Sequence, residues 1–184
     1  MLGERGGAAV EAAIVTPVIL AMLFGIIELG FLFKDYLAVA GSVRAGVRIA
    51  SANPRRATFA QVAADDVAAT GTAANLGDVK QMWVYKADPA SDKPIGYTTF
   101  ADCSICVKFR WDTGTRAFVP ISDNWAATSQ NACSSSSTGG PPDRIGVYVQ
   151  LKHDAFTKLV FDTITISEAS ILTLEPMPFL TGCK

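Results

Sequence analysis

The strongest pattern in the chain is one long apolar run near its N-terminus. It extends from Ala12 to Phe33, 22 residues in which Thr16 and Glu28 are the polar interruptions. At a rise of ~1.5 Å per residue, a helix over this run would be ~33 Å long. That length is enough to cross the ~30 Å hydrocarbon core of a bilayer. The pattern therefore predicts a transmembrane helix.

The helix is expected to continue beyond the lipid as an amphipathic segment. Apolar and small residues recur there at spacings of three and four, at Tyr36, Ala40, Val43, Val47 and Ala50. This spacing places them on one helix face, and Asn53-Pro54 would end the helix. Such a face needs a partner surface, and we expect it to be a sheet formed by the downstream chain.

Alternation of apolar and polar residues predicts four strands, over residues 79–86, 105–111, 145–153 and 163–174. A short helix precedes them. Thr58 to Gln61 is typical of a capping box at its start and Gly71 of its end, which would place Phe59, Ala63 and Val67 together. The predicted fold class is α+β, with the long N-terminal helix packed on a small antiparallel sheet of about four strands. We expect the second face of this sheet to be in contact with water.

A segment rich in Ser, Thr, Gly, Pro and Asn covers residues 112–144 and predicts a long loop without strands. It contains Trp125. Loops of this length often carry function, so Trp125 could present an adhesive surface. We favour the alternative, in which Trp125 fixes the loop to the core.

Length and charge limit the classes of function. The 184 residues are enough for one compact domain, residues 54–184, behind an N-terminal helix over residues 7–53. The formal net charge is -1 and the basic residues are scattered. A nucleic-acid partner is therefore not expected, because binding to the phosphate backbone requires clustered positive charge.

Four cysteines follow the apolar run, at Cys103, Cys106, Cys133 and Cys183. An even number suits two disulfides in an oxidising compartment, and three pairings are open. We expect Cys133 to be tied to Cys103 or Cys106. Zinc is disfavoured because Cys103 and Cys106 form the one closely spaced pair and the only histidine, His153, is far away. No metal or cofactor is expected.

Few residues suggest catalysis. Asp65 and Asp66 are adjacent on a predicted helix and so would not face each other. His153, beside Asp154, could be imagined with Ser167 or Ser170 as a nucleophile and base, but no glycine elbow, triad spacing or phosphate loop accompanies them. We expect His153 to be a solvent-facing residue at a strand end, and we do not expect an enzyme.

The terminal amine and Arg5 favour a cytoplasmic N-terminus, which would put the cysteines outside the cytoplasm. The alternative is an ordinary signal peptide, cut near Ala40 in the small-residue sequence Ala38-Val39-Ala40, that releases a secreted enzyme or binding domain. Three features oppose it. The apolar run exceeds the usual 7–15 residues, Glu11 and Glu28 lie at its entrance and inside it, and Lys34-Asp35 separate it from the cut.

The stretch from Arg5 to Glu11, followed by Ala12 to Pro17 and the apolar run, resembles the start of TadE-like proteins, pilin-like minor subunits of tight-adherence (Flp-type) pili. The family's usual aromatic residue after the glutamate is Ala12 here. A second patch, residues 164–170 followed by Glu175-Pro176, resembles the end of the TadE-like domain.

The resemblance implies that residues 1–6 are a leader, which a membrane prepilin peptidase removes between Gly6 and Gly7. Glu11 would then be the fifth mature residue and would guide docking to other pilins and minor pilins or to the inner-membrane assembly platform. In a low-dielectric layer, Glu11 could pair with the new terminal ammonium of a neighbouring subunit. The implied location is the cytoplasmic membrane, in contact with lipid, with a single pass, the C-terminal domain outside and incorporation into an extracellular pilus as a further step.

Overall fold

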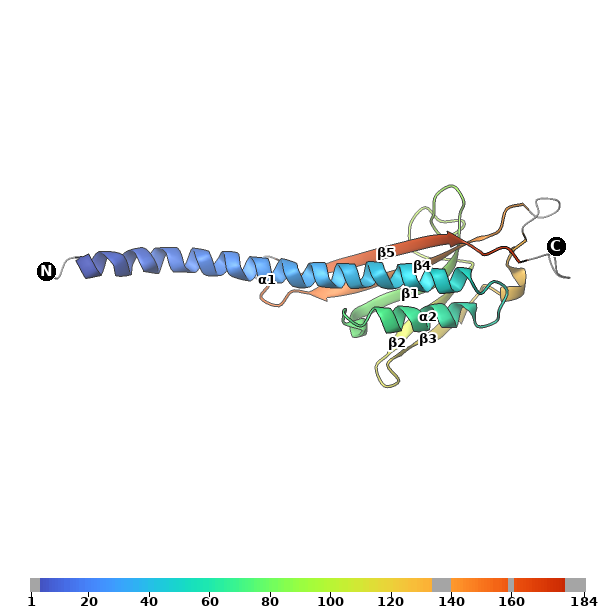
Figure 1. Ribbon diagram of the computed structural model, residues 1–184, viewed down its shortest axis with the longest axis horizontal. Helices are drawn as coiled ribbons and strands as arrows, with labels where there is room; N and C mark the ends of the chain where they lie inside the picture. Colours follow the sequence, from blue (N-terminus) through green and yellow to red (C-terminus); the bar gives the residue numbers. More distant parts are fainter. Residues whose placement is uncertain (1–3, 134–139, 159–160, 178–184) are drawn as a thin grey trace.

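The computed structural model describes residues 4–133, 140–158 and 161–177. A single helix, α1 (Glu4–Ser51), dominates its shape. The N-terminal half of α1 projects away from all other elements, whereas its C-terminal half lies on the folded part of the chain (Figure 1). The arrangement is the predicted one of a long helix on an antiparallel sheet, in the α+β class.

The C-terminal half of α1 packs through the predicted stripe. Ala40, Val43, Val47 and Ala50 are all buried. Tyr36, the first member of the predicted stripe, is 42% exposed because it lies near the edge of the sheet that the helix covers. The helix ends at Ser51, where the Ser51 carbonyl accepts a hydrogen bond from Glu175 N at 2.9 Å. The segment after the last strand therefore supplies a hydrogen-bond donor to a backbone carbonyl at the C-terminal end of α1.

Helix α2 (Phe59–Thr70) lies beside α1, with Phe59, Ala63 and Val67 buried together as predicted. The two helices approach closely at Gly46. A Cβ placed there would lie 3.0 Å from Ala63 O and 2.6 Å from the Val67 side chain. Glycine at position 46 thus allows the two backbones to meet.

The predicted capping box of α2 is wrong. Thr58 makes no side-chain hydrogen bond to the first turn. Gln61 instead donates to Asp65 Oδ1 at 2.8 Å and to the carbonyl of Phe118 at 3.0 Å. Its amide is used to join α2 to the sheet rather than to close the helix end, and Gly71 follows the helix as expected.

The sheet has five antiparallel strands in the order β3-β2-β1-β4-β5. They are β1 (Val79–Ala87), β2 (Cys106–Asp112), β3 (Ala117–Asp123), β4 (Arg144–Asp154) and β5 (Thr163–Thr173), with short 3₁₀ turns at Leu76–Asp78 and Ala127–Ser129. Helix α1 contacts β4 and β5, and α2 contacts β3 and β1. Strands β4 and β5 pair without a break from Arg144 opposite Thr173 to Asp154 opposite Thr163, so no bulge interrupts β5.

Strand β3 falls inside the segment predicted to be a loop, which corrects that prediction. Pro120 lies in the middle of the strand, and a proline disfavours a strand in sequence reasoning because it cannot donate to the ladder. Here β3 is the edge strand of the sheet. An edge strand tolerates proline, since one side of its backbone has no partner strand.

The second face of the sheet is covered in part, whereas the expectation was a wet face, and Arg110, Thr165 and Ser167 on that face are exposed. Trp83, Tyr85 and Tyr148 are buried there beneath the segment between β1 and β2. Phe100 of this segment stacks on Tyr148 with ring centroids 4.3 Å apart, and the Tyr85 hydroxyl donates to Asp92 O at 3.0 Å. Burial raises the pKa of Tyr85. The middle of the sheet, around β1 and the start of β4, therefore lies between the helices and this segment.

Cys103 and Cys106 form a disulfide with each other at the end of the covering segment. Cys133 is also disulfide-bonded, so the predicted bond from Cys133 to Cys103 or Cys106 is wrong. The chain turns tightly just before β2 and brings the two nearby sulfurs together, whereas Cys133 lies in a bridge to Met177, after the last strand. Cys183 lies outside the described residues.

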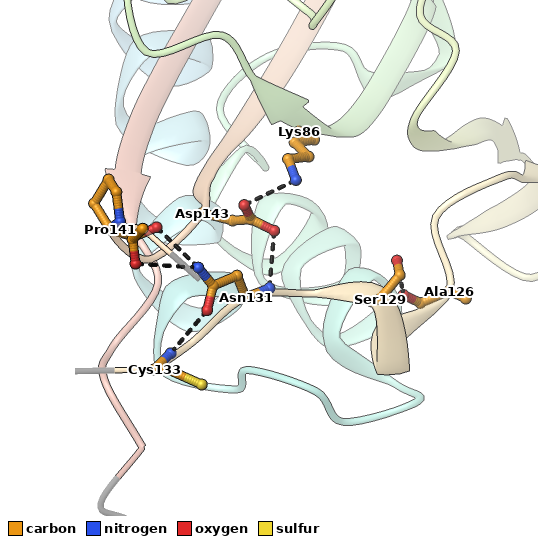
Figure 2. A network of polar contacts seen from close by, with 8 residues as sticks. Lys86, Ala126, Ser129, Asn131, Cys133, Pro141 and Asp143 are labelled. Atoms are coloured by element: carbon orange, nitrogen blue, oxygen red, sulfur yellow. Dashed lines mark hydrogen bonds and ion pairs between the residues drawn. The ribbon is translucent and has the colours of Figure 1, made fainter. Parts of the chain in front are cut away.

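The rest of the 112–144 segment contacts the folded part of the chain at two places, Trp125 and Asp143. Trp125 is buried and packs edge-on against Phe59 with ring centroids 5.2 Å apart, which confirms that it holds the segment to the core. The Asp143 carboxylate lies between Lys86 and Asn131 (Figure 2), 2.8 Å from Lys86 Nζ and 2.9 Å from Asn131 N. Residues 134–139, which include most of the predicted Ser-rich stretch, lie outside the described residues.

Candidate functional site

The projecting half of α1 is apolar on every side. From Gly7 to Ile27 the residues are exposed or half-exposed, and none is buried. The large apolar side chains among them include Val10, Ile14, Met22 and Ile26. By length and composition this helix could cross a membrane, and its most apolar window is wholly unburied. A helix that is apolar all round without protein contacts matches a lipid environment.

The predicted processing and assembly residues lie at the tip of this projection. Gly6 and Gly7 belong to the first turns of α1, and Glu11 follows Gly7 by four residues on the same helix. Glu11 is exposed. Within the described part of the chain, its carboxylate has no hydrogen-bond or ion-pair partner. The fold thus presents Glu11 outward without satisfying it.

The next carboxylate along α1, that of Glu28, is buried and hydrogen-bonded, in contrast to Glu11. Glu28 is 1% exposed although it lies within the apolar run. Its Oε2 accepts a hydrogen bond from Thr157 N at 3.0 Å and a second from the Thr157 hydroxyl. Thr157 belongs to the connection between β4 and β5. A charged group buried in this way must be hydrogen-bonded to be tolerated, and the connection supplies the donors.

Two helical turns further along α1, the carboxylate of Asp35 contacts the imidazole of His153. Asp35 Oδ2 is 2.7 Å from His153 Nδ1, and His153 is 6% exposed. The prediction that His153 faces solvent is therefore wrong. Strand β4 runs alongside α1 as far as Asp154, so its penultimate side chain meets the helix instead of water. Lys34 adds an ion pair to the other Asp35 oxygen at 3.2 Å.

Glu28, Asp35, His153 and Thr157 form what we call the polar junction, which ties the projecting helix to the β4–β5 hairpin. The sequence contained a signal for it. Residues seven apart share a helix face, so Glu28 and Asp35 were two carboxylates on one side of an otherwise apolar helix. The alternation of β4 did not indicate that its end would supply the partner.

A second pair of charges lies at the loop end of the hairpin, beside the junction. Lys152 Nζ lies 2.8 Å from one Asp154 oxygen, and the Thr163 hydroxyl donates to Asp154 Oδ1 at 2.8 Å. The hydrogen bond from Lys152, followed by that from Thr163, lowers the pKa of Asp154. The same bond raises the pKa of Lys152. Both groups are solvated, so they hold the hairpin in register without a large energetic contribution.

The remaining candidate residues are not brought together. Asp65 bonds Gln61 on α2, and Asp66 lies beside it on the same helix. Ser167 lies opposite Gln150 in the sheet, whereas His153 lies opposite Ile164. The Ser167 hydroxyl accepts a hydrogen bond from Gln150 Nε2 at 3.3 Å, so its partner is an amide and not a histidine.

No curated protein and no solved structure matches this chain. The sequence model of the family described as TadE-like protein matches residues 6–48. The match begins at Gly6, spans Glu11, Glu28 and Asp35, and ends three residues before α1 does. It does not include the patch at residues 164–176. The N-terminal helix of this chain therefore carries a match to the TadE-like domain, which supports a general association with tight-adherence pili.

Proposed function

We propose that this chain is a membrane-anchored, pilin-like minor subunit of a tight-adherence pilus, and that it works by assembly rather than by catalysis. The observation that carries the proposal is the projecting half of α1. It is a lipid-compatible helix, it lies within the TadE-like domain, and it presents Glu11 without a partner in the described part of the chain. A carboxylate that is left unpaired at the membrane edge would be stabilised by an ionic or hydrogen-bonding partner from another molecule.

The partner we propose for Glu11 is the terminal ammonium of a neighbouring pilin or minor pilin. A prepilin peptidase would create this group by cutting between Gly6 and Gly7. The pair would form where the dielectric constant is low, so its geometry would favour one axial register between neighbouring helices. The inner-membrane assembly platform would receive the subunit in this state, with its folded domain outside the cytoplasm.

The structure offers an argument against the alternative of a secreted domain cut near Ala40. Ala40 is buried, together with Val39 and Val43 around it. A cut there would divide a continuous core helix. It would also remove Asp35 from His153 and Glu28 from Thr157, leaving the end of the β4–β5 hairpin without its partners. A domain released in this way would lose part of its own core.

Intact-mass analysis of the chain recovered from cells separates the two functions. The proposal predicts a mature chain that begins at Gly7 and stays in the membrane fraction. A chain that begins near Gly41 and appears free in the medium would overturn it. Gly6→Leu provides the matched variant, because a bulky side chain at the cut should obstruct close approach of the backbone and leave the precursor intact.

A further inference from the structure

We propose that the connection between β4 and β5 is a second membrane contact, in which Phe156 lies in the interfacial layer of the bilayer beside the anchor. This inference rests on the proposed membrane anchorage of α1. We call residues 155–158, 161 and 162 the hairpin tip; residues 159 and 160 lie outside the described residues and are not part of it. The occupant of the surface is lipid, for the reasons that follow.

The first reason is position. The hairpin tip lies alongside α1 at the point where the helix leaves the folded part, and it is directed toward the projecting half (Figure 1). Thr157 reaches Glu28. Glu28 precedes Phe33, the end of the apolar run, by five residues, or ~7.5 Å along the helix. The hairpin tip therefore lies beside the C-terminal part of the apolar run.

The second reason is the length of the helix before the tip. Residues 7–27 contain no buried residue, and Glu28 is the first. These 21 residues extend ~31 Å, which matches the ~30 Å hydrocarbon core. The hydrocarbon boundary then falls close to Glu28, at the level of the hairpin tip. The polar junction would shield Glu28 from lipid where shielding is needed.

The third reason is the chemistry of the exposed side chains. Phe156 is 80% exposed, the most exposed of the large apolar residues in the described part of the chain. The centroid of its ring lies 6.4 Å from that of Phe31 on α1. Phe31 is itself exposed. The two rings extend the apolar surface of the projecting helix onto the folded domain. An aromatic ring at this depth is favoured at the membrane interface.

Charges surround the two rings in a way that fits headgroups. Lys34 and Lys158 are both largely exposed. The Lys34 ammonium lies 5.7 Å from the centre of the Phe31 ring, so an apolar stem beside the ring ends in a cation that can reach the headgroup layer. Lys158 pairs with Asp162 at 3.3 Å at the surface of the tip. The contact is therefore apolar in its centre, with the ion pairs of Lys34 with Asp35 and of Lys158 with Asp162 at its rim.

The test uses the full-length chain in nanodiscs of phosphatidylcholine and phosphatidylglycerol. No cysteine in the described part of the chain is free, so Phe156→Cys gives one site for an environment-sensitive fluorophore. Two matched sites are labelled separately. Leu23→Cys lies in the projecting helix, and Ile121→Cys replaces an exposed apolar residue on β3, at the opposite edge of the sheet. Spin-labelled lipids then quench whichever fluorophores touch the bilayer.

We expect the Phe156 label to lose emission to lipids labelled near the headgroup, and to lose less to lipids labelled near the chain end. The Leu23 label should be quenched by both, and the Ile121 label by neither. Quenching at Leu23 with none at Phe156 would overturn the hairpin contact and leave the anchor intact. No quenching at either site would overturn the anchor itself, and the contact with it.

Discussion

Glu28 and Thr157 are 129 residues apart in the chain and meet through two hydrogen bonds, one from the backbone and one from the hydroxyl of Thr157. This contact fixes the β4–β5 hairpin to the helix at the point where the helix leaves the folded domain. The polar junction is thus the joint between the anchor and the sheet, and its strength determines whether the two move as one body.

The hydroxyl of Thr157 should be required for this joint. Thr157→Val keeps the shape of the side chain but removes one donor from a buried carboxylate, which is expected to cost ~1–3 kcal/mol. Thr157→Ser retains the hydroxyl and is the matched control. Limited proteolysis of the detergent-solubilised protein should show faster cleavage in the hairpin of the valine variant only. Equal cleavage rates for all three proteins would mean that the hydroxyl contributes nothing.

Asp35 and His153 should be energetically coupled. A double-mutant cycle of Asp35→Ala and His153→Ala, read as the free energy of unfolding, should give a coupling of ~0.5–3 kcal/mol, since the carboxylate and the imidazole are in contact and buried. Lys34→Ala is the control. Its ion pair is half-exposed, and exposed pairs contribute ~0–1 kcal/mol. Additive effects at Asp35 and His153 would show that their contact is incidental.

Two glycines of α1 should respond in opposite ways. Gly46→Ala would place a methyl group against Val67 and the Ala63 carbonyl, and overpacking of this kind costs ~1–3 kcal/mol. Gly41→Ala meets nothing within 4 Å and should stabilise the isolated subunit by up to ~1 kcal/mol through helix propensity. Thermal unfolding of the two variants in detergent compares them. A destabilised Gly41→Ala, or a neutral Gly46→Ala, would contradict the described helix packing.

The sequence predicted those elements whose pattern depends on neighbouring residues alone. The apolar run and the alternation at Val107 and Phe109 were local, and they located α1 and β2 to within a few residues. Strand β3 was missed because Pro120 and the neighbouring turn residues dominate its composition. Only its place at the sheet edge makes that proline acceptable.

The polar junction was missed for a different reason. Periodicity assigned His153 to a strand end, and a strand end is usually wet. The 2.7 Å contact with Asp35 depends on β4 and α1 lying side by side, although the two partners are 118 residues apart in the chain. In the same way, the cover over Trp83 and Tyr148 comes from an irregular segment with no period of its own. Contacts of this kind follow from the tertiary arrangement and leave only a faint trace in sequence, here the seven-residue spacing of Glu28 and Asp35.

The measurement that tests the central claim most directly is the fate of a Glu11→Ala variant in cells. Removal of a carboxylate from the membrane edge should ease insertion, so export and processing should be normal. Assembly should fail, because the ammonium of a neighbouring subunit would lose its partner, and stranding one half of a desolvated pair costs ~3–5 kcal/mol. We predict a variant that reaches the membrane fraction at the normal level and with the normal mature mass, but is absent from sheared pili or unable to support piliation. Normal piliation by Glu11→Ala at equal protein level would contradict the account.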